Sequence, residues 1–195
     1  GFAALGTHNA KRMLAYSSIA HAGYLLIALV SANSMGISGT LFYLLAYIFM
    51  NVGAFAIVIV LSHKNDEFIQ INDYAGLGFK HPLLAIAMTI FMFSMAGVPP
   101  MAGFVGKFYI FSAAIKSGYV VLAIIGVINS VISVYYYLRI TVIMYMKEPT
   151  REFTPLTLSP FIVAAIVISV IGTLQLGIFP SKVIEMAQQA TLILK

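Results

Sequence analysis

The stretch Phe93-Ser-Met-Ala-Gly-Val-Pro-Pro-Met-Ala-Gly-Phe-Val-Gly-Lys107-Phe-Tyr-Ile110 lies inside an apolar run from Pro82 to Ile115, whose only formal charge is Lys107. As one straight helix the run would be about 50 Å long at ~1.5 Å per residue, well over the ~30 Å hydrocarbon thickness of a bilayer. We therefore expect an interruption. Residues 97–100, Gly-Val-Pro-Pro, are the expected place, because adjacent prolines remove two backbone donors and clash with the preceding turn.

The expected break leaves backbone carbonyls near Met95 and Ala96 without helical partners. Irregular backbone at membrane depth is tolerated only where protein or a water-filled cavity covers it. A broken helix with a lysine about two to three turns beyond the break is typical of an ion pathway.

The composition indicates an all-α polytopic membrane protein. Hydrophobic residues make up 61% of the 195 residues and charged residues 9%, which is more apolar than a soluble domain of this size needs. The net charge of +5 is interpreted as loop charge that sets orientation, and no nucleic acid partner is expected. The chain has no cysteine, which excludes disulfides, iron–sulfur clusters and thiolate metal sites, and its four histidines lack metal-ligand spacing.

We expect one membrane domain over residues 1–195, a helical bundle of about five spans. The expected spans cover residues 11–31, 40–61, 81–116, 118–146 and 158–179, and the third is broken at Gly97–Pro100. A short uncharged turn is expected at 32–39, an interfacial turn within the polar segment 62–81, and a mildly amphipathic stretch at 181–195 that can lie along the interface.

Because Gly1 opens in an apolar segment without an initiating Met, the chain is expected to be part of a longer polypeptide.

The basic residues other than Lys107 predict the orientation. One side collects most of them, namely Lys11, Arg12, Lys64, Lys80, Arg139, Lys147 and Arg151, while the other side has Lys116, Lys182 and Lys195. The positive-inside rule then places the N-terminal end in the cytoplasm and the C-terminus outside.

Three expected spans carry polar residues that share one helical face. These are Ser17, His21 and Tyr24 in the first span, Tyr43, Tyr47 and Asn51 in the second, and Asn129, Ser133 and Tyr136 in the fourth. In lipid such faces must meet a neighbouring helix or a hydrated interior. They predict either a shared polar seam through the bundle or hydrogen bonds that only hold helices together.

Lys107 and His21 are the candidate proton carriers that composition alone provides. No carboxylate lies in an expected span, so Lys107 is expected to be neutral, hydrated or paired with a group outside this chain. A buried lysine can exchange its proton reversibly, although a lysine near a helix end can also reach the membrane surface, and Lys116 follows on the same span. His21 could relay protons or could be a structural histidine bonded to Ser17. Lys11, at a helix entrance, is by composition a positive-inside anchor.

The motif Lys11-Arg-Met-Leu-Ala-Tyr-Ser-Ser-Ile-Ala-His-Ala-Gly-Tyr24 resembles the antiporter-like membrane subunits of respiratory complex I, the proton-translocating NADH:quinone oxidoreductase. Its Ser-Ser-Ile-Ala-His form is most similar to the subunit N branch. Asp73-Tyr-Ala-Gly-Leu77 and the stretch 93–109 fit the same family in order and spacing. The resemblance covers essentially the whole chain and implies a fourteen-helix fold with two inverted five-helix repeats, of which this chain would supply roughly the C-terminal third.

The resemblance also implies residue roles. The family's lysine after the Pro-containing break carries protons, which assigns that role to Lys107, and the lysine of its Lys-Arg-x-Leu-Ala-Tyr-Ser motif contributes to a central polar axis, which assigns that role to Lys11. A sibling subunit carries His, His and Lys where this chain has Tyr43, Tyr47 and Asn51, so a proton route through the second span must use tyrosines and water. The candidate proton-translocation residues are Lys107, Lys11, His21, Tyr43 and Tyr47, next to the helix break at Gly97, Pro99 and Pro100.

The implied function is a subunit of a translocase that couples quinone reduction elsewhere in the complex to proton transfer. NADH, FMN, iron–sulfur clusters and quinone would be bound by other subunits, and this chain would hold no cofactor, metal or redox-catalytic residue. Its partners would be other membrane subunits, including neighbouring antiporter-like subunits, and the lipid of an energy-transducing membrane, the bacterial inner membrane. The alternatives are a subunit of a cation/proton antiporter or of a membrane-bound hydrogenase, and a membrane scaffold that moves no protons.

Overall fold

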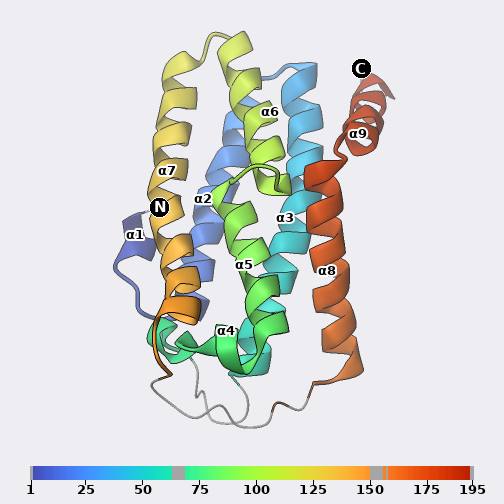
Figure 1. Ribbon diagram of the computed structural model, residues 1–195. Coiled ribbons are helices and arrows are strands. Elements are labelled where there is room, and N and C mark those ends of the chain that lie inside the picture. Colours follow the sequence, from blue (N-terminus) through green and yellow to red (C-terminus); the bar gives the residue numbers. More distant parts are fainter. Residues whose placement is uncertain (1, 63–68, 150–155, 157, 194–195) are drawn as a thin grey trace.

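The computed structural model describes residues 2–62, 69–149, 156 and 158–193, and this part of the chain is built from helices without a β-strand. In chain order the elements are α1 (Phe2–Leu5), α2 (Ala10–Val30), α3 (Ser34–Leu61), the 3₁₀ helix η1 (Ile71–Tyr74), α4 (Leu77–Lys80), α5 (Pro82–Ala96), α6 (Ala102–Lys116), α7 (Val120–Met146), α8 (Pro160–Ile178) and α9 (Ser181–Ile193). The long helices stand side by side in an upright bundle (Figure 1). Helix α3 packs against α2, α5, α6, α8 and α9, and therefore organises the bundle.

Four helices in the described ranges, α2, α3, α7 and α8, are long and apolar enough to cross a membrane. Helices α2, α7 and α8 follow the expected spans closely, and the predicted all-helical membrane fold is confirmed. The expected turn at 32–39 is too long, because α3 already begins at Ser34. The side chain of Asn33 caps α3 by accepting a hydrogen bond from the Gly36 N–H, and this cap allows the helix to start early.

The third expected span is divided into α5 and α6 (Figure 1). Each half has 15 residues. Each is therefore about 22 Å long at ~1.5 Å per residue, too short to cross the bilayer alone. Helix α5 ends at Ala96, α6 begins at Ala102, and the irregular segment between them lies at mid-height in the bundle. The break is where the two prolines predicted it.

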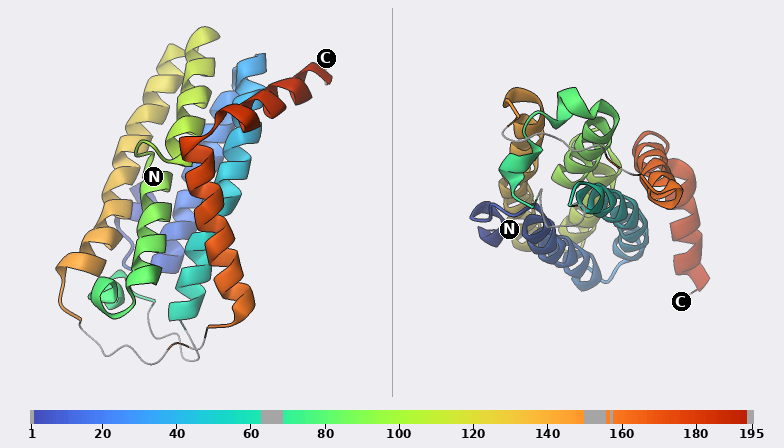
Figure 2. Two further views of the ribbon diagram at one scale, coloured as in Figure 1. Left: turned by 45° about the vertical axis from the view of Figure 1, so that its right-hand side comes forward. Right: turned by 90° about the horizontal axis from the view of Figure 1, so that it is seen from below.

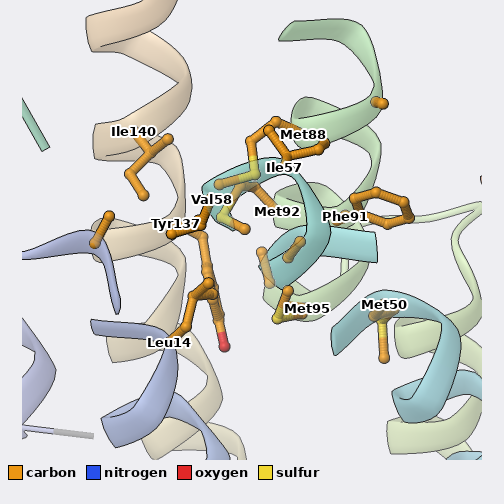
Figure 3. Close-up of a cluster of buried hydrophobic side chains, with 14 of the residues drawn as sticks. Leu14, Met50, Ile57, Val58, Met88, Phe91, Met92, Met95, Tyr137 and Ile140 are labelled. Carbon is orange, nitrogen blue, oxygen red and sulfur yellow. The ribbon is translucent and has the colours of Figure 1, made fainter. Parts of the chain in front are cut away.

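Below the break the bundle is filled by an apolar core. Side chains from α2, α3, α5 and α7 converge there, among them Leu14, Met50, Ile57, Met88 and Tyr137 (Figure 3). Large apolar side chains also cover the outer surface, as in Ile19, Val121 and Phe161. A bundle that is apolar inside and outside is suited to lipid surroundings.

The two ends of the bundle differ. Lys80 at the end of α4 lies at one end, together with the start of α2 and the end of α7, while Lys116 and α9 lie toward the other (Figures 1 and 2). Helix α9 runs at an angle to the bundle and packs against α3, with Ile184 and Ala187 buried and Met186 exposed. Lys64, Arg151 and Lys195 fall outside the described residues.

Candidate functional site

Lys107 places its ammonium group at the helix break. Its side chain is 4% exposed. Its Nζ donates hydrogen bonds to the carbonyl oxygen of Met95 at 2.8 Å, to that of Ala96 at 3.2 Å and to Ser130 Oγ at 2.9 Å. In a continuous helix these two carbonyls would accept from the N–H groups of residues 99 and 100, which are prolines and have none. The break thus creates the acceptors that hold the lysine.

We expected Lys107 to be neutral, hydrated or paired with a group outside this chain, and did not consider acceptors within the chain. An ammonium group has three N–H donors, and each of them has an oxygen acceptor within this chain. The ammonium group also points to the break at mid-height, away from the ends of the bundle.

Two glycines permit the close approach of α5 and α6. Gly97 ends α5 with a φ of +89°, in the left-handed region that favours glycine. Gly103 lies directly against the Ser94 carbonyl, where a Cβ atom would collide with it, and the Gly103 N–H donates to Ser94 Oγ at 3.1 Å. Between them, Pro99 and Pro100 are joined by a cis peptide bond.

His21 lies in a second cluster, held by both ring nitrogens. Its Nδ1 is 2.6 Å from Tyr43 Oη and its Nε2 is 2.9 Å from Tyr137 Oη. The three side chains come from α2, α3 and α7 and are buried. A neutral imidazole has one N–H, so one tyrosine donates to the ring and the other accepts from it. The suggested bond to Ser17 is wrong, because both ring nitrogens of His21 contact tyrosines instead. Ser17 Oγ donates to the Leu14 carbonyl.

Tyr24 connects the two clusters. The Lys107 Nζ lies 5.0 Å from the centre of the Tyr24 ring, within the range of a cation–π interaction. The same ring meets His21 edge-on, with centroids 5.8 Å apart, and the Tyr24 hydroxyl accepts a hydrogen bond from Asn129 Nδ2 at 3.1 Å. Lys107, Tyr24, His21, Tyr43 and Tyr137 form a contiguous group, which we call the polar seam.

The other residues expected at the site lie at different distances from the polar seam. Tyr47 borders the seam: its hydroxyl donates to Ser18 Oγ at 2.7 Å and its ring centroid is 4.7 Å from that of His21. Lys11 is in the first turn of α2, about 15 Å along the helix from His21 at ~1.5 Å per residue, so the structure does not bring it into this group. Asn51 Oδ1 is buried and has no hydrogen-bond partner among the described residues.

The sequence analysis missed Ser130 and Tyr137, which contact Lys107 and His21 from α7. It selected Asn129, Ser133 and Tyr136 as the polar face, whereas Ser130, Ser133 and Tyr137 have equally good helical spacing. That alternative spacing was the available signal. In the described ranges no cluster of His, Asp or Glu side chains has the composition of a metal site.

Known proteins are similar to this chain in both sequence and fold. The family model described as "NADH:quinone oxidoreductase/Mrp antiporter, TM" matches residues 1–133. The NADH-quinone oxidoreductase subunit N of Trichlorobacter lovleyi is 55% identical over 189 residues, which are 97% of this chain and 39% of that protein. The subunit N of Paramagnetospirillum magneticum is 46% identical over 194 residues, 99% of this chain and 39% of that protein. The chain thus spans about two fifths of the length of these curated relatives.

Solved structures extend the comparison. A chain of respiratory complex I from Thermus thermophilus with bound aureothin matches 94% of this chain and 41% of its own length, with a TM-score of 0.81 and 34% identity. A chain of the Mrp complex from Dietzia sp. matches 96% of this chain and 43% of its own length, with a TM-score of 0.85 and 21% identity, a likeness of fold alone. The resemblance found in the sequence motifs is confirmed. The chain belongs to the NADH:quinone oxidoreductase/Mrp antiporter family of membrane proteins.

Proposed function

We propose that the chain is part of a proton-translocating membrane subunit of a respiratory NADH:quinone oxidoreductase, to which it contributes a C-terminal portion as one membrane domain. The observation that carries the proposal is the Lys107 ammonium group, enclosed at a helix break and linked through Tyr24 to His21. Its relatives, NADH-quinone oxidoreductase subunits N, indicate the kind of complex.

In this proposal the chain conducts protons and other subunits carry the redox chemistry. NADH, FMN, iron–sulfur clusters and quinone belong to those subunits, and other membrane subunits, neighbouring antiporter-like ones among them, are the partners. Electron transfer elsewhere changes the electric field along the polar seam. Because charge interactions are strong in a medium of low dielectric constant, such a change alters which group of the seam holds the excess proton.

The seam residues have chemistry that suits this role. Lys107 and His21 can each take up and release a proton, whereas the tyrosine hydroxyls can donate and accept hydrogen bonds between them. Tyr47 borders this route, and Lys11 would join it from the end of the bundle where α2 begins, through water. The membrane would be the bacterial inner membrane, with the C-terminus outside.

A cation/proton antiporter subunit is the second candidate, because the family model includes the Mrp antiporter and an Mrp chain shares the fold. The subunit N relatives are far more similar in sequence, at 55% and 46% identity against 21% for the Mrp chain, and this favours the oxidoreductase. In a non-translocating scaffold, the seam would only hold helices together.

The proposal is tested by measuring proton pumping and NADH:quinone electron transfer side by side in membrane vesicles. The complete complex carries Lys107→Ala or Lys107→Arg and is compared with the unmodified enzyme after its assembly has been checked. Arginine keeps the positive charge but does not release its proton, so both variants are expected to lose pumping. Normal pumping by either assembled variant would contradict the proposal, and normal pumping by Lys107→Ala would favour the scaffold.

A further inference from the structure

The three acceptors around the Lys107 ammonium group are chemically unequal. The carbonyl oxygens of Met95 and Ala96 only accept hydrogen bonds, whereas the Ser130 hydroxyl can also donate one. When Lys107 loses a proton, its nitrogen gains a lone pair that needs a donor. Among these three partners, Ser130 alone can supply that donor.

Ser130 also borders a cavity that opens between α6 and α7. The cavity has a volume of about 350 Å³. Lys107, Gly97 and Ser130 line it, while Phe104, Phe108 and Phe111 contribute aromatic walls. Water needs polar partners as well as room, and Lys107, Ser112 and Ser130 supply them in a cavity whose other walls are largely apolar. The cavity therefore suits water next to these polar groups. Lys107 itself is almost fully buried and Ser130 is half-buried, which places the serine between the ammonium group and the open side.

We propose that Ser130 is the proton-transfer residue between Lys107 and water in the cavity between α6 and α7, so that Lys107 exchanges its proton sideways through the bundle wall. This inference rests on the proposed function, because it requires that Lys107 carries protons. It adds to that function the residue that exchanges protons with Lys107, which is Ser130, and the side from which water reaches Ser130, which is the cavity between α6 and α7.

The step balances without a further reactant. One N–H bond of the ammonium group breaks as its proton moves to Ser130 Oγ, and the original hydroxyl proton moves from Oγ to a water molecule in the cavity. Lysine becomes a neutral amine, water becomes hydronium, and serine remains a neutral hydroxyl. The hydroxyl then donates to the amine nitrogen. Rotation about the Cβ–Oγ bond returns it to its starting orientation once Lys107 is reprotonated.

The experiment uses the complete complex in vesicles and replaces Ser130 by alanine or threonine. Ser130→Ala is expected to slow pumping-coupled turnover by about tenfold, since a positioned proton-transfer group contributes roughly 10² to 10⁴ and water replaces it in part. It should also increase the solvent deuterium isotope effect on turnover. Ser130→Thr keeps a hydroxyl at the same place and is expected to restore both values.

Ser112→Ala is the matched control, because Ser112 lines the same cavity but is not one of the three acceptors of the Lys107 ammonium group. It is expected to leave turnover and the isotope effect unchanged. Normal turnover in Ser130→Ala would overturn the inference. So would slow turnover with an unchanged isotope effect, or failure of Ser130→Thr to restore activity, since either result marks a structural role.

The failure of this inference can be separated from the failure of the proposed function. If Lys107→Ala abolishes pumping while Ser130→Ala pumps normally, Lys107 keeps its role and Ser130 loses the one proposed here. If Lys107→Ala pumps normally, the proposed function itself fails.

Discussion

At the residue scale, the arrangement around Lys107 resolves a conflict between charge and hydrocarbon. A charged side chain at the centre of a bilayer is costly unless it is paired or hydrated. Pro99 and Pro100 have no N–H to donate, so the carbonyls four residues before them, those of Met95 and Ala96, have no helical partner. These two carbonyls accept hydrogen bonds from the Lys107 ammonium group instead. The same local sequence therefore breaks the helix and supplies the partners of the lysine.

His21 is expected to depend on Tyr137 for stability. Tyr137→Phe leaves one buried ring nitrogen without its partner, which should cost about 1–3 kcal/mol in the free energy of unfolding. The measurement is the thermal unfolding midpoint of this subunit within the purified complex.

Tyr74→Phe is the matched control for that substitution. Tyr74 is as fully buried as Tyr137, but its hydroxyl has no hydrogen-bond partner among the described residues. Burial, with Asp73 nearby, raises the pKa of the Tyr74 hydroxyl, so the group stays uncharged and its loss should be nearly neutral. Equal midpoints for the two variants would show that the bond to His21 adds nothing.

At the element scale, the junction of α5 and α6 depends on the absence of a side chain at Gly103. A Cβ atom there would overlap the Ser94 carbonyl, which belongs to backbone and cannot turn aside. Gly103→Ala should therefore destabilise the subunit by about 1–3 kcal/mol and displace the carbonyls that hold Lys107. The expected result is reduced assembly or reduced pumping, read from the amount of assembled complex and its pumping rate.

Gly23→Ala provides the comparison within a helix. No atom lies within 4 Å of where its Cβ would be, outside its own helix backbone. Alanine is also the better helix former by about 1 kcal/mol, so this change should be neutral or stabilising. If both alanine variants behaved like the unmodified protein, close packing at the break would not be required.

The elements were more predictable than the contacts between them. The apolar runs and the Gly97–Pro100 segment predicted the helices and the break, because length, hydrophobicity and proline chemistry are local properties. The early start of α3 was missed because the cap at Asn33 was not recognised. Ser130 and Tyr137 were missed because the rotation of α7 is fixed by packing against α5, α6 and α2, and several faces of that helix carry polar residues. The roles of Lys107, Lys11, His21, Tyr43 and Tyr47 in proton transfer stay predictions.

At the scale of the whole molecule, the orientation in the membrane can be tested because the chain contains no cysteine. Lys80 on α4 and Lys182 on α9 lie toward opposite ends of the bundle and are both exposed (Figure 1). With the C-terminus outside, a membrane-impermeant maleimide should label Lys182→Cys in right-side-out vesicles. Lys80→Cys should be labelled in inside-out vesicles. The reverse pattern would overturn the predicted orientation.

The central claim is that Lys107 carries protons, and the most direct measurement is the number of protons pumped per electron with Lys107→Ala and Lys116→Ala compared in the assembled complex. Lys116 is on the same helix but exposed at its end, so it controls for the loss of one positive charge. We expect the ratio to fall with Lys107→Ala and to stay unchanged with Lys116→Ala. An unchanged ratio in both variants would show that Lys107 only anchors the helix.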